Sequence, residues 1–412
     1  MTDLLNVDDA LQIILSRIEQ VSSEDIELES ALNRVLAQDI SAPTNLPPFA
    51  NSSMDGYAVR SEDIQQATRE TPRRLAVVMD IPAGKTPEKA IDTGQAARIM
   101  TGAPLPDGAD AVIPVEDTDA NWRTWINETT AQQVAIYRTV ESGAYVRAIG
   151  EDIRQGVQVL KNGTLLRPQE IGMLAALGFP RVKVVRQPLV AILTTGDELV
   201  NVDQPLTPGK IRDVNTYTLT GLVHANGGVV YPLPIARDSL EEVRNLFKSA
   251  LQPKPDMLIS SAGVSVGAAD LIRTVLEELG EVGFWRINLR PGKPLAFGHI
   301  QDVPFFGLPG NPVSAMVTFE VLVRPALLKM AGRVAKDRII QAVCDEDIKS
   351  DGRRSYIRVN LVEKDGVYHA TTTGTQSSGA LMSMVIADGL MIVPEDVQSV
   401  KAGTTLDVRL LK

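Results

Sequence analysis

Residues 256–312 read DMLISSAGVSVGAADLIRTVLEELGEVGFWRINLRPGKPLAFGHIQDVPFFGLPGNP, and this stretch decides the fold. Met257 to Ser261 has the composition of a buried strand, and a Gly/Ser turn follows it. Apolar residues then recur at helical spacing as far as Leu279, and Gly280 ends the pattern. This order of strand, turn and helix predicts one βα unit of an open sheet.

The turn of this unit contains Gly263, Ser265 and Gly267. Open α/β sheets bind ligands at the carboxyl ends of their strands, where glycines let backbone N–H groups approach an anion closely. These residues are therefore candidates for binding substrate. A tight turn that only connects two elements explains the glycines equally well.

The composition is that of a soluble protein. A chain of 412 residues, 44% of them hydrophobic, is long enough for about two to four domains. The first residues lack the pattern of a signal peptide, and no apolar run is long enough to cross a membrane. With a single cysteine, Cys344, these features predict a cytoplasmic protein. The net charge of −10 argues against a nucleic-acid partner.

The first part of the chain changes character several times. Val7 to Val21 and Leu28 to Leu36 each predict a helix. A Pro-rich link runs from Ile40 to Phe49, and residues 55–145 carry the short apolar runs of a small β domain. Pro168 to Gly178 then predicts a short helix.

From Arg181 onward, strands alternate with helices. Leu189 to Thr195 is a predicted strand, Ser239 to Glu242 forms a capping-box pattern, and Pro312 begins a long helix that reaches Met330. This alternation predicts a doubly wound, mostly parallel sheet. Residues from about 338 onward are again β-rich, with a hairpin signal at Lys364 to Gly366, and predict a small barrel or sandwich.

Three acidic residues follow strand ends or begin helices: Glu198, Asp238 and Asp270. The predicted topology brings them to one rim of the sheet, where carboxylates suit a hard divalent cation such as Mg²⁺. Helix capping accounts equally well for Asp238 and Asp270. Arg286, Arg290 and Lys293 place positive charges near the same rim, and in an acidic chain an oxyanion pocket is the better interpretation than a solvated edge.

Seven short motifs occur along the chain in this order: MDGYAV, RIMTGAP, GEDI, TTGDEL, SSAGVSVG, RPGKP and GLPGNPVSA. Together, and in this order, they resemble the molybdopterin molybdenumtransferase family, whose relatives include the carboxyl part of gephyrin. The resemblance implies a multidomain α/β plus β fold. Its expected parts are a discontinuous helical/extended domain (residues 1–54 and 146–177), an inserted β domain (55–145), a doubly wound molybdopterin-binding α/β domain (178–331) and a carboxyl-terminal β-barrel (332–412).

The resemblance also implies an activity. The expected substrate is adenylylated molybdopterin, whose phosphoanhydride is cleaved with Mg²⁺, releasing AMP, while molybdate delivers its metal to the dithiolene sulfurs. The family implies a homodimer, and a molybdopterin adenylyltransferase and molybdoenzyme chaperones are candidate partners.

Residue roles follow from the same resemblance. Asp238, Asp270 and Glu198 would hold Mg²⁺, while Arg290, Lys293 and Arg286 would hold the molybdate or the developing phosphate charge. Asp55 and Thr101 would come from the partner subunit. The further expected residues are Pro309 and Pro312 with the Gly/Ser turn for substrate binding, and Arg358 and Ser378 for molybdate.

The sequence departs from the family pattern at four positions. Ala262 stands where a second glycine is usual, Ala268 where an acidic residue is common, and arginine replaces lysine at 286 and 290. An arginine keeps the charge but replaces a point donor by a planar fork, which leaves molybdate against tungstate preference open.

Two other classes of function compete with this one. GVSVG fits the nucleophile elbow of α/β-hydrolases, with Ser265 as nucleophile and His299 or His369 as base, although no HGGG-type motif is present. A non-catalytic, gephyrin-like scaffold is the second. The retained Asp55, Asp238, Asp270 and Lys293 favour an enzyme.

Overall fold

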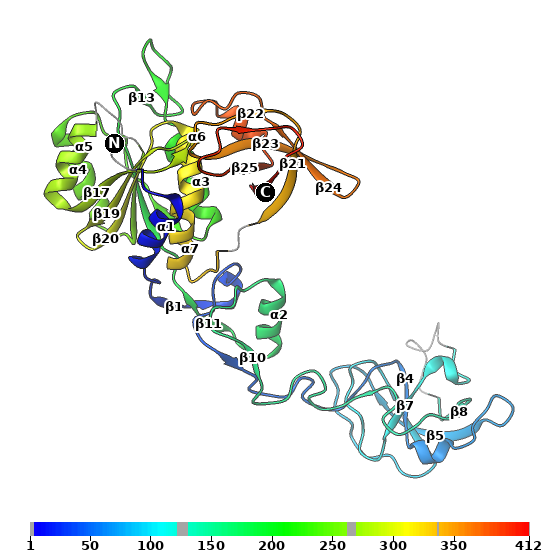
Figure 1. Cartoon of the computed structure of the whole chain (residues 1–412). Coiled ribbons are helices and arrows are strands. Elements are labelled where there is room, and N and C mark those ends of the chain that lie inside the picture. Colours follow the sequence, from blue (N-terminus) through cyan, green and yellow to red (C-terminus); the bar gives the residue numbers. More distant parts are fainter. Residues whose placement is uncertain (1–3, 122–130, 262–268, 336–337, 412) are drawn as a thin grey trace. The chain divides into compact units, whose positions relative to one another are not determined.

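The computed structural model describes residues 4–121, 131–261, 269–335 and 338–411. The chain forms two compact units (Figure 1). The first comprises Met1–Ile26, Ser30–Ala37 and Lys183–Lys412, and the second comprises Glu27–Glu29 and Gln38–Val182. The division passes through β1 (Ser23–Glu27) and β11 (Arg181–Val185). Among the described residues, no helix has the length and hydropathy needed to cross a membrane.

A six-stranded sheet forms the centre of the first unit. Its first four strands are parallel, the fifth is antiparallel to them, and the sixth, antiparallel to the fifth, runs in the same direction as the first four. This confirms the predicted mostly parallel α/β sheet. In spatial order the strands are β15 (Val229–Tyr231), β12 (Leu189–Thr194), β16 (Met257–Ser261), β20 (Val303–Leu308), β19 (Pro294–Ile300) and β17 (Gly280–Arg286).

Both faces of this sheet are covered by helices. Val190 and Ile192 of β12 join one apolar core, and Ala191 and Leu193 join the other, because successive side chains of a strand point to opposite faces. The first core receives α3 (Asn215–Ala225) and the helical run after β20, and the second receives α4 (Leu240–Leu251) and α5 (Ala269–Leu279).

The helical run after β20 begins at Pro312, as predicted, and Asn311 is its N-cap residue. It consists of α6 (Pro312–Thr318), a π-helical turn (Phe319–Val323) and α7 (Arg324–Met330). Pro325 lies in the first turn of α7, and because it has no N–H it cannot donate a hydrogen bond back to the π-helical turn.

The amino-terminal helix α1 (Val7–Ser16) also packs on the α/β core, through Val7, Ala10 and Ile14. The helix predicted from Leu28 to Leu36 is wrong: only a 3₁₀ turn (Leu28–Ser30) forms there. Asn33 has φ of 61°, a left-handed conformation that a helix cannot contain.

The carboxyl-terminal part of the first unit is a closed β-barrel. Its ring of strands is β23 (Arg354–Lys364), β24 (Val367–Thr372), β21 (Ile339–Cys344), β27 (Thr405–Leu410) and β25 (Gly389–Val393), which pairs back onto β23. The predicted hairpin at Lys364–Gly366 is confirmed, with Asp365 and Gly366 both at positive φ. Smaller elements here are β22 (Ile348–Lys349), β26 (Ser399–Val400) and α8 (Met382–Val385).

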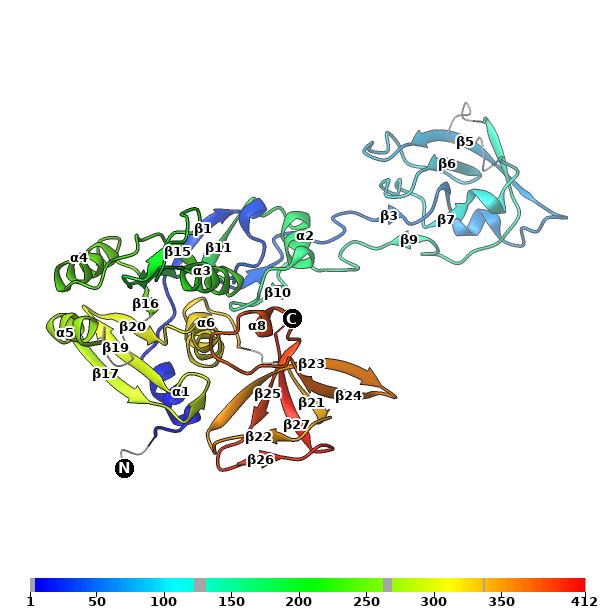
Figure 2. The ribbon, with the colours of Figure 1, turned by 90° about the horizontal axis from the view of Figure 1, so that it is seen from above.

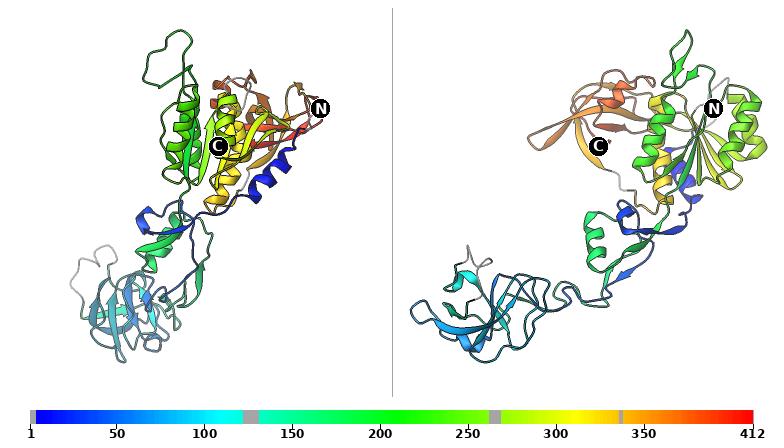
Figure 3. Two further views of the ribbon diagram at one scale, coloured as in Figure 1. Left: turned by 90° about the vertical axis from the view of Figure 1, so that its left-hand side faces the viewer. Right: turned by 180° about the vertical axis from the view of Figure 1, so that it is seen from behind.

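A short strand from the α/β part of the first unit pairs with the barrel. β18 (Leu289–Arg290) ends on the first residue of the RPGKP loop. It pairs in parallel with β23 of the barrel, Leu289 opposite Arg354 and Arg290 opposite Ser355. In Figure 2, α6 lies between the parallel sheet and the barrel strands. The loop between β13 (Leu199–Val200) and β14 (Ile211–Arg212) projects from the rim of the sheet (Figure 3).

The second unit contains a five-stranded sheet. Its order is β7 (Ala111–Pro114), β4 (Gly56–Val59), β6 (Gln95–Ile99), β5 (Arg73–Ile81) and β8 (Gln133–Ile136), in agreement with the predicted β domain. Other elements are β2 (Ile40–Ser41), β3 (Asn51–Ser52), β9 (Val146–Arg147), β10 (Gln158–Leu160), α2 (Pro168–Ala176) and 3₁₀ turns at Ser61–Ile64 and Val115–Asp117.

Candidate active site

The acidic rim begins where β12 ends. Asp197 and Asp238 hold each other: the Asp197 N–H donates to Asp238 Oδ2, and the Asp238 N–H donates to Asp197 Oδ1, both across 3.3 Å. A bridge between Thr195 and Ala236 sets this pairing. Glu198 and Asp238 were expected at this rim from the sequence, whereas Asp197 was not, although its place directly after a glycine at a strand end was a signal for it.

These carboxylates suit a hard cation. The second oxygen of Asp197 and of Asp238 accepts no hydrogen bond within the described part of the chain, and Mg²⁺ prefers such oxygens together with water. The described residues contain no cluster of three or more His, Cys, Asp or Glu that could hold a metal. Asp270 lies in the first turn of α5, and its side chain is outside what the structure describes. The predicted Mg²⁺ site stays a prediction.

A cavity of about 670 Å³ opens at the same rim, and we call it the rim cavity. Glu198, Asp213, Asn215 and Ser261 supply polar groups to its wall. Its apolar lining is Leu199, Leu206, Ile211 and Val214, and the β20–α6 loop contributes Gly310, Asn311 and Pro312. Pro309, also predicted to bind substrate, is a buried residue of this loop and does not line the cavity.

Asn215 joins the strand ends at the rim cavity. Its Nδ2 donates to Ser261 Oγ at 2.6 Å and to Gly310 O at 2.7 Å, which fixes the amide orientation, because a flipped amide would place two oxygens in contact. The side chain is 8% exposed, and Oδ1 has no partner within the described residues. Asn215 is not among the site residues expected from the sequence.

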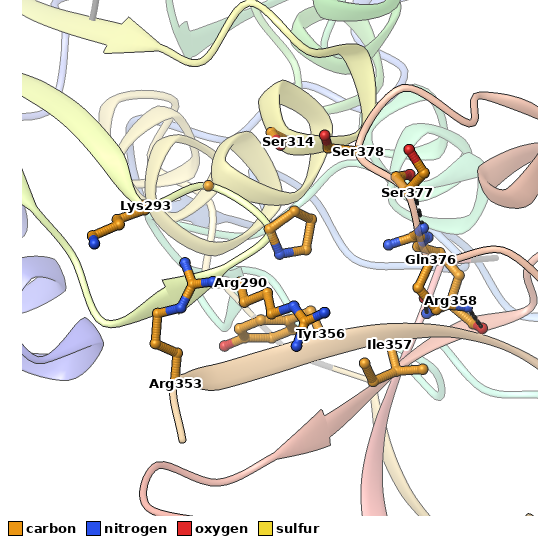
Figure 4. Close-up of a pocket in the computed structure, with 12 residues that line it drawn as sticks. Arg290, Lys293, Ser314, Arg353, Tyr356, Ile357, Arg358, Gln376, Ser377 and Ser378 are labelled. Atoms are coloured by element: carbon orange, nitrogen blue, oxygen red, sulfur yellow. Dashed lines mark hydrogen bonds between the residues drawn. The ribbon is translucent and has the colours of Figure 1, made fainter. Parts of the chain in front are cut away.

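A second cavity, of about 400 Å³, is strongly cationic, and we call it the oxyanion cavity (Figure 4). Four basic side chains line it, Arg290, Lys293, Arg353 and Arg358, together with Ser314, Tyr356, Gln376, Ser377 and Ser378. Arg290, Lys293, Arg358 and Ser378 are the four residues expected from the sequence to bind molybdate, and they come together here. Arg286 is exposed at the end of β17 and does not line this cavity.

Arg358 is the most buried of these cations, at 1% exposure. Its Nε donates to Ser383 Oγ at 3.1 Å, and its Nη2 donates to the carbonyls of Ser377 and Thr375 at 3.1 and 3.3 Å. Burial, and then repulsion by Arg290, lowers the pKa of Arg358 to about 10. An anion in the cavity would offset both effects.

The RPGKP loop is held against the helical run. Gly292 has φ of +119°, and a Cβ atom there would lie 2.3 Å from Thr318 Oγ1, so only glycine fits. On its other side the loop is held by the pairing of β18 with β23. The positions of Arg290 and Lys293 are therefore set jointly by the α/β part and the barrel.

The two cavities adjoin at the start of α6. The Val313 N–H donates to the carbonyl of Ser378 across 3.1 Å. Ser314 and Ser378 line the oxyanion cavity, while their neighbours in the chain, Pro312 and Gly379, line the rim cavity. A ligand that reaches from one cavity into the other would pass along this turn.

Asp55 and Thr101 meet in the second unit. The N–H and the hydroxyl of Thr101 both donate to Asp55 Oδ1, at 2.7 and 2.9 Å, and both residues are exposed. The register of β4 with β6 places them together. A Cβ on Gly56 would lie 1.9 Å from the carbonyl oxygen of Ile113, which explains the glycine of the MDG motif.

The Gly/Ser turn, Gly263, Ser265 and Gly267, and the departures at Ala262 and Ala268 lie outside the described residues. The bases proposed for a serine hydrolase are nevertheless placed. His299 lines a cavity with Asp256 and Pro304, at the edge where the parallel strands begin, whereas the turn after Ser261 follows a strand end. His369 Nδ1 forms a hydrogen bond with Asp345 Oδ1 at 2.6 Å. This placement of His299 does not favour a triad.

Comparison with protein families divides the chain into three matched regions. Residues 5–178 match the MoeA N-terminal region (domain I and II), and residues 191–329 match a probable molybdopterin binding domain. Residues 341–411 match the MoeA C-terminal region (domain IV). The matches cover nearly the whole chain in one order.

Individual proteins match along their full length. The molybdopterin molybdenumtransferase of Haemophilus influenzae is 36% identical, covering 98% of each chain, and that of Bacillus subtilis is 34% identical, covering 98% of this chain and 94% of the relative. The crystal structure of the molybdopterin biosynthesis MoeA protein from Pyrococcus horikosii superposes with a TM-score of 0.83, at 36% identity and complete coverage of both chains. The chain therefore belongs to the MoeA family of molybdopterin molybdenumtransferases.

Proposed function

We propose that this chain inserts molybdenum from molybdate into adenylylated molybdopterin, with cleavage of the phosphoanhydride and release of AMP. One observation carries the proposal: four basic side chains from distant parts of the chain line one cavity, beside a larger cavity at the strand ends. Molybdate is a divalent tetrahedral oxyanion, and clustered arginines recognise such groups.

In the oxyanion cavity, Arg358 would supply a buried charge and Arg290 and Lys293 more exposed ones. Ser378 would offer a hydroxyl to the same oxyanion. Because these groups are held before the ligand arrives, they stabilise its charge with little reorganisation. Arg286 is more suited to attracting anions from solution, since it is exposed and outside the cavity.

The rim cavity would take the organic part of the substrate. Leu206 and Ile211 offer an apolar wall to a flat heterocycle, and the Asn215 side chain lies on the polar side of the same cavity. Its position next to the oxyanion cavity would bring the dithiolene sulfurs towards the metal oxyanion.

Asp197 and Asp238, with Glu198 and Asp270 nearby in the sequence pattern, would hold Mg²⁺ at the strand ends. Bound there, Mg²⁺ would neutralise the phosphate charge. The two hydrogen bonds from backbone N–H groups to carboxylates, which link Asp197 and Asp238 in both directions, keep both carboxylates at this rim.

We further propose that the protein acts as a homodimer in which the Asp55–Thr101 pair of one copy completes the site of the other. The pair belongs to one compact unit and both cavities belong to the other, so each half of the proposed site lies within a single unit. Asp55 would orient water at the phosphoanhydride.

AMP release tests the proposed activity. Wild-type protein with adenylylated molybdopterin, Mg²⁺ and molybdate should release AMP, and Lys293→Ala should lower the rate at limiting molybdate at least tenfold by removing one cavity charge. Lys401→Ala removes an exposed lysine that pairs with Asp347 elsewhere in the barrel, and should leave the rate unchanged. The absence of AMP release by the wild-type protein would exclude the proposed reaction.

A further inference from the structure

The oxyanion cavity has a carboxylate of its own at its edge. Asp351 contacts Arg353 through Nε, at 3.2 Å to Oδ1 and 3.1 Å to Oδ2, and through Nη2, and it lies 3.8 Å from Nη1 of Arg290. We propose that Asp351 is a built-in counter-anion: it competes with the bound oxyanion for Arg290 and Arg353, and so keeps molybdate binding weak enough for the metal to leave. This inference rests on the proposed function.

The backbone also holds Asp351 in place, apart from the arginine side chains. It lies in the turn between β22 and β23, where Gly352 has positive φ and the Arg353 N–H donates to Asp351 Oδ1 at 3.3 Å. Its side chain is 42% exposed, so the carboxylate can remain hydrated when it loses an arginine. Asp351 loses less when an oxyanion takes Arg290 than when it takes Arg353, because Arg290 is too distant to form a hydrogen bond with Asp351.

Asp351 is the counter-charge of two of the cavity cations. Of the four cavity cations, Arg290 and Arg353 form ion pairs, and Asp351 is their only acidic partner among the described residues. Lys293 and Arg358 form no ion pair with any described residue. Contact with Arg353 lowers the pKa of Asp351, so it is ionised at neutral pH. Asp347, the nearest carboxylate along the chain, pairs with Lys401, and Glu395 pairs with Arg354.

A counter-anion has a clear purpose in a transfer reaction. An oxyanion held by four unopposed cations would be stabilised in the ground state, and ground-state stabilisation lowers KM without raising kcat. As the oxyanion is consumed, Asp351 can pair again with Arg290 and Arg353. It acts through these two arginines and is a positioning residue.

Asp351→Asn is the test, because asparagine keeps the shape of the side chain and the turn bond. The control is Asp347→Asn, which removes the same charge from the same barrel but from a carboxylate paired with Lys401. Equilibrium binding of molybdate, sulfate and nitrate to the full-length protein at low salt gives the first readout. AMP release at saturating and limiting molybdate gives the second.

The expected effect depends on ligand charge. Removing one negative charge from the edge of the cavity should tighten nitrate binding about threefold and molybdate or sulfate binding about tenfold, because Coulomb energy scales with the charge of the ligand. Both effects should shrink at high salt. KM for molybdate and kcat should both fall in Asp351→Asn, while Asp351→Glu and Asp347→Asn should remain close to wild type.

Each other outcome overturns the inference. Weaker or unchanged oxyanion binding by Asp351→Asn would show that Asp351 only orients Arg353, and equal gains for nitrate and molybdate would show that charge is not the cause. If wild-type protein bound neither molybdate nor sulfate, the oxyanion cavity itself, and with it the proposed function, would fail. If wild type bound both but the variant matched it, only the role of Asp351 would be wrong.

Discussion

Thr101 donates twice to a single oxygen of Asp55, through its backbone N–H at 2.7 Å and its hydroxyl at 2.9 Å. The two residues are far apart in the sequence and come from different turns of the small β sheet. Because both hydrogen bonds go to Oδ1, the other carboxylate oxygen of Asp55 is left to face solvent or a ligand.

Thr101→Val should therefore reduce AMP release while leaving the fold intact. The variant keeps the backbone bond but loses the hydroxyl bond to the carboxylate, and a hydrogen bond to a charged group contributes about 1.5–3 kcal/mol. The loss expected in kcat is roughly tenfold or more. Thr101→Ser keeps both donors and should remain near wild type; equal rates for Val and Ser would show that the hydroxyl does not serve the reaction.

Mixing two inactive variants tests the dimeric site. Asp55→Asn and Lys293→Ala should each release little AMP alone. If the two halves of a site come from different copies, random mixing should restore roughly a quarter of wild-type activity, because half of the dimers then contain one intact site out of two. A mixture that stays as inactive as its components would place both halves of the site in one copy.

The rim cavity makes a separate prediction about the loop between β13 and β14. Leu206 and Val202 are both exposed on this loop, at 52% and 45%, but only Leu206 lines the cavity. Leu206→Ser should weaken binding of adenylylated molybdopterin about tenfold through lost apolar contact, while Val202→Ser should not. Titrations with AMP and with a free pterin would show which ring meets Leu206. Identical effects of the two substitutions would exclude this wall.

Acid should destabilise the second unit through Glu170. The hydrogen bond from Arg167 lowers the pKa of Glu170 to about 2 in the folded protein, from an unfolded value of 4.5. A depressed carboxyl pKa stabilises the fold above the unfolded value, and this contribution is lost as pH falls from 4.5 towards 2. After solvent screening of the exposed Arg167, the contribution is about 1–2 kcal/mol.

Glu170→Gln should remove that part of the pH dependence. Urea unfolding followed at pH 7 and at pH 3 should show a smaller difference for the variant than for wild type. Glu151→Gln is a suitable control, since Glu151 is exposed in the same unit and makes no ion pair among the described residues. A pH dependence that Glu170→Gln leaves unaltered would contradict the assignment.

Local patterns in the sequence predicted the elements well where neighbours along the chain decide the structure. The strand Met257–Ser261 and the helix start at Pro312 follow from apolar spacing and from the proline at the first helical position, which act over a few positions. The helix predicted at Leu28–Leu36 failed because Asn33 adopts a left-handed conformation, which apolar spacing alone does not reveal.

The sequence by itself determined the βα alternation, the barrel hairpin and the motifs that mark the family, because these depend on short-range periodicity and turn chemistry. Only the tertiary structure decided that Arg290 and Arg358 share a cavity, that Arg286 lies outside it, and that Asp197 pairs with Asp238. The physical reason is that strand pairing between β18 and β23, and between the ends of neighbouring parallel strands, joins residues distant in the chain. No local pattern encodes which distant strand edge will be the partner.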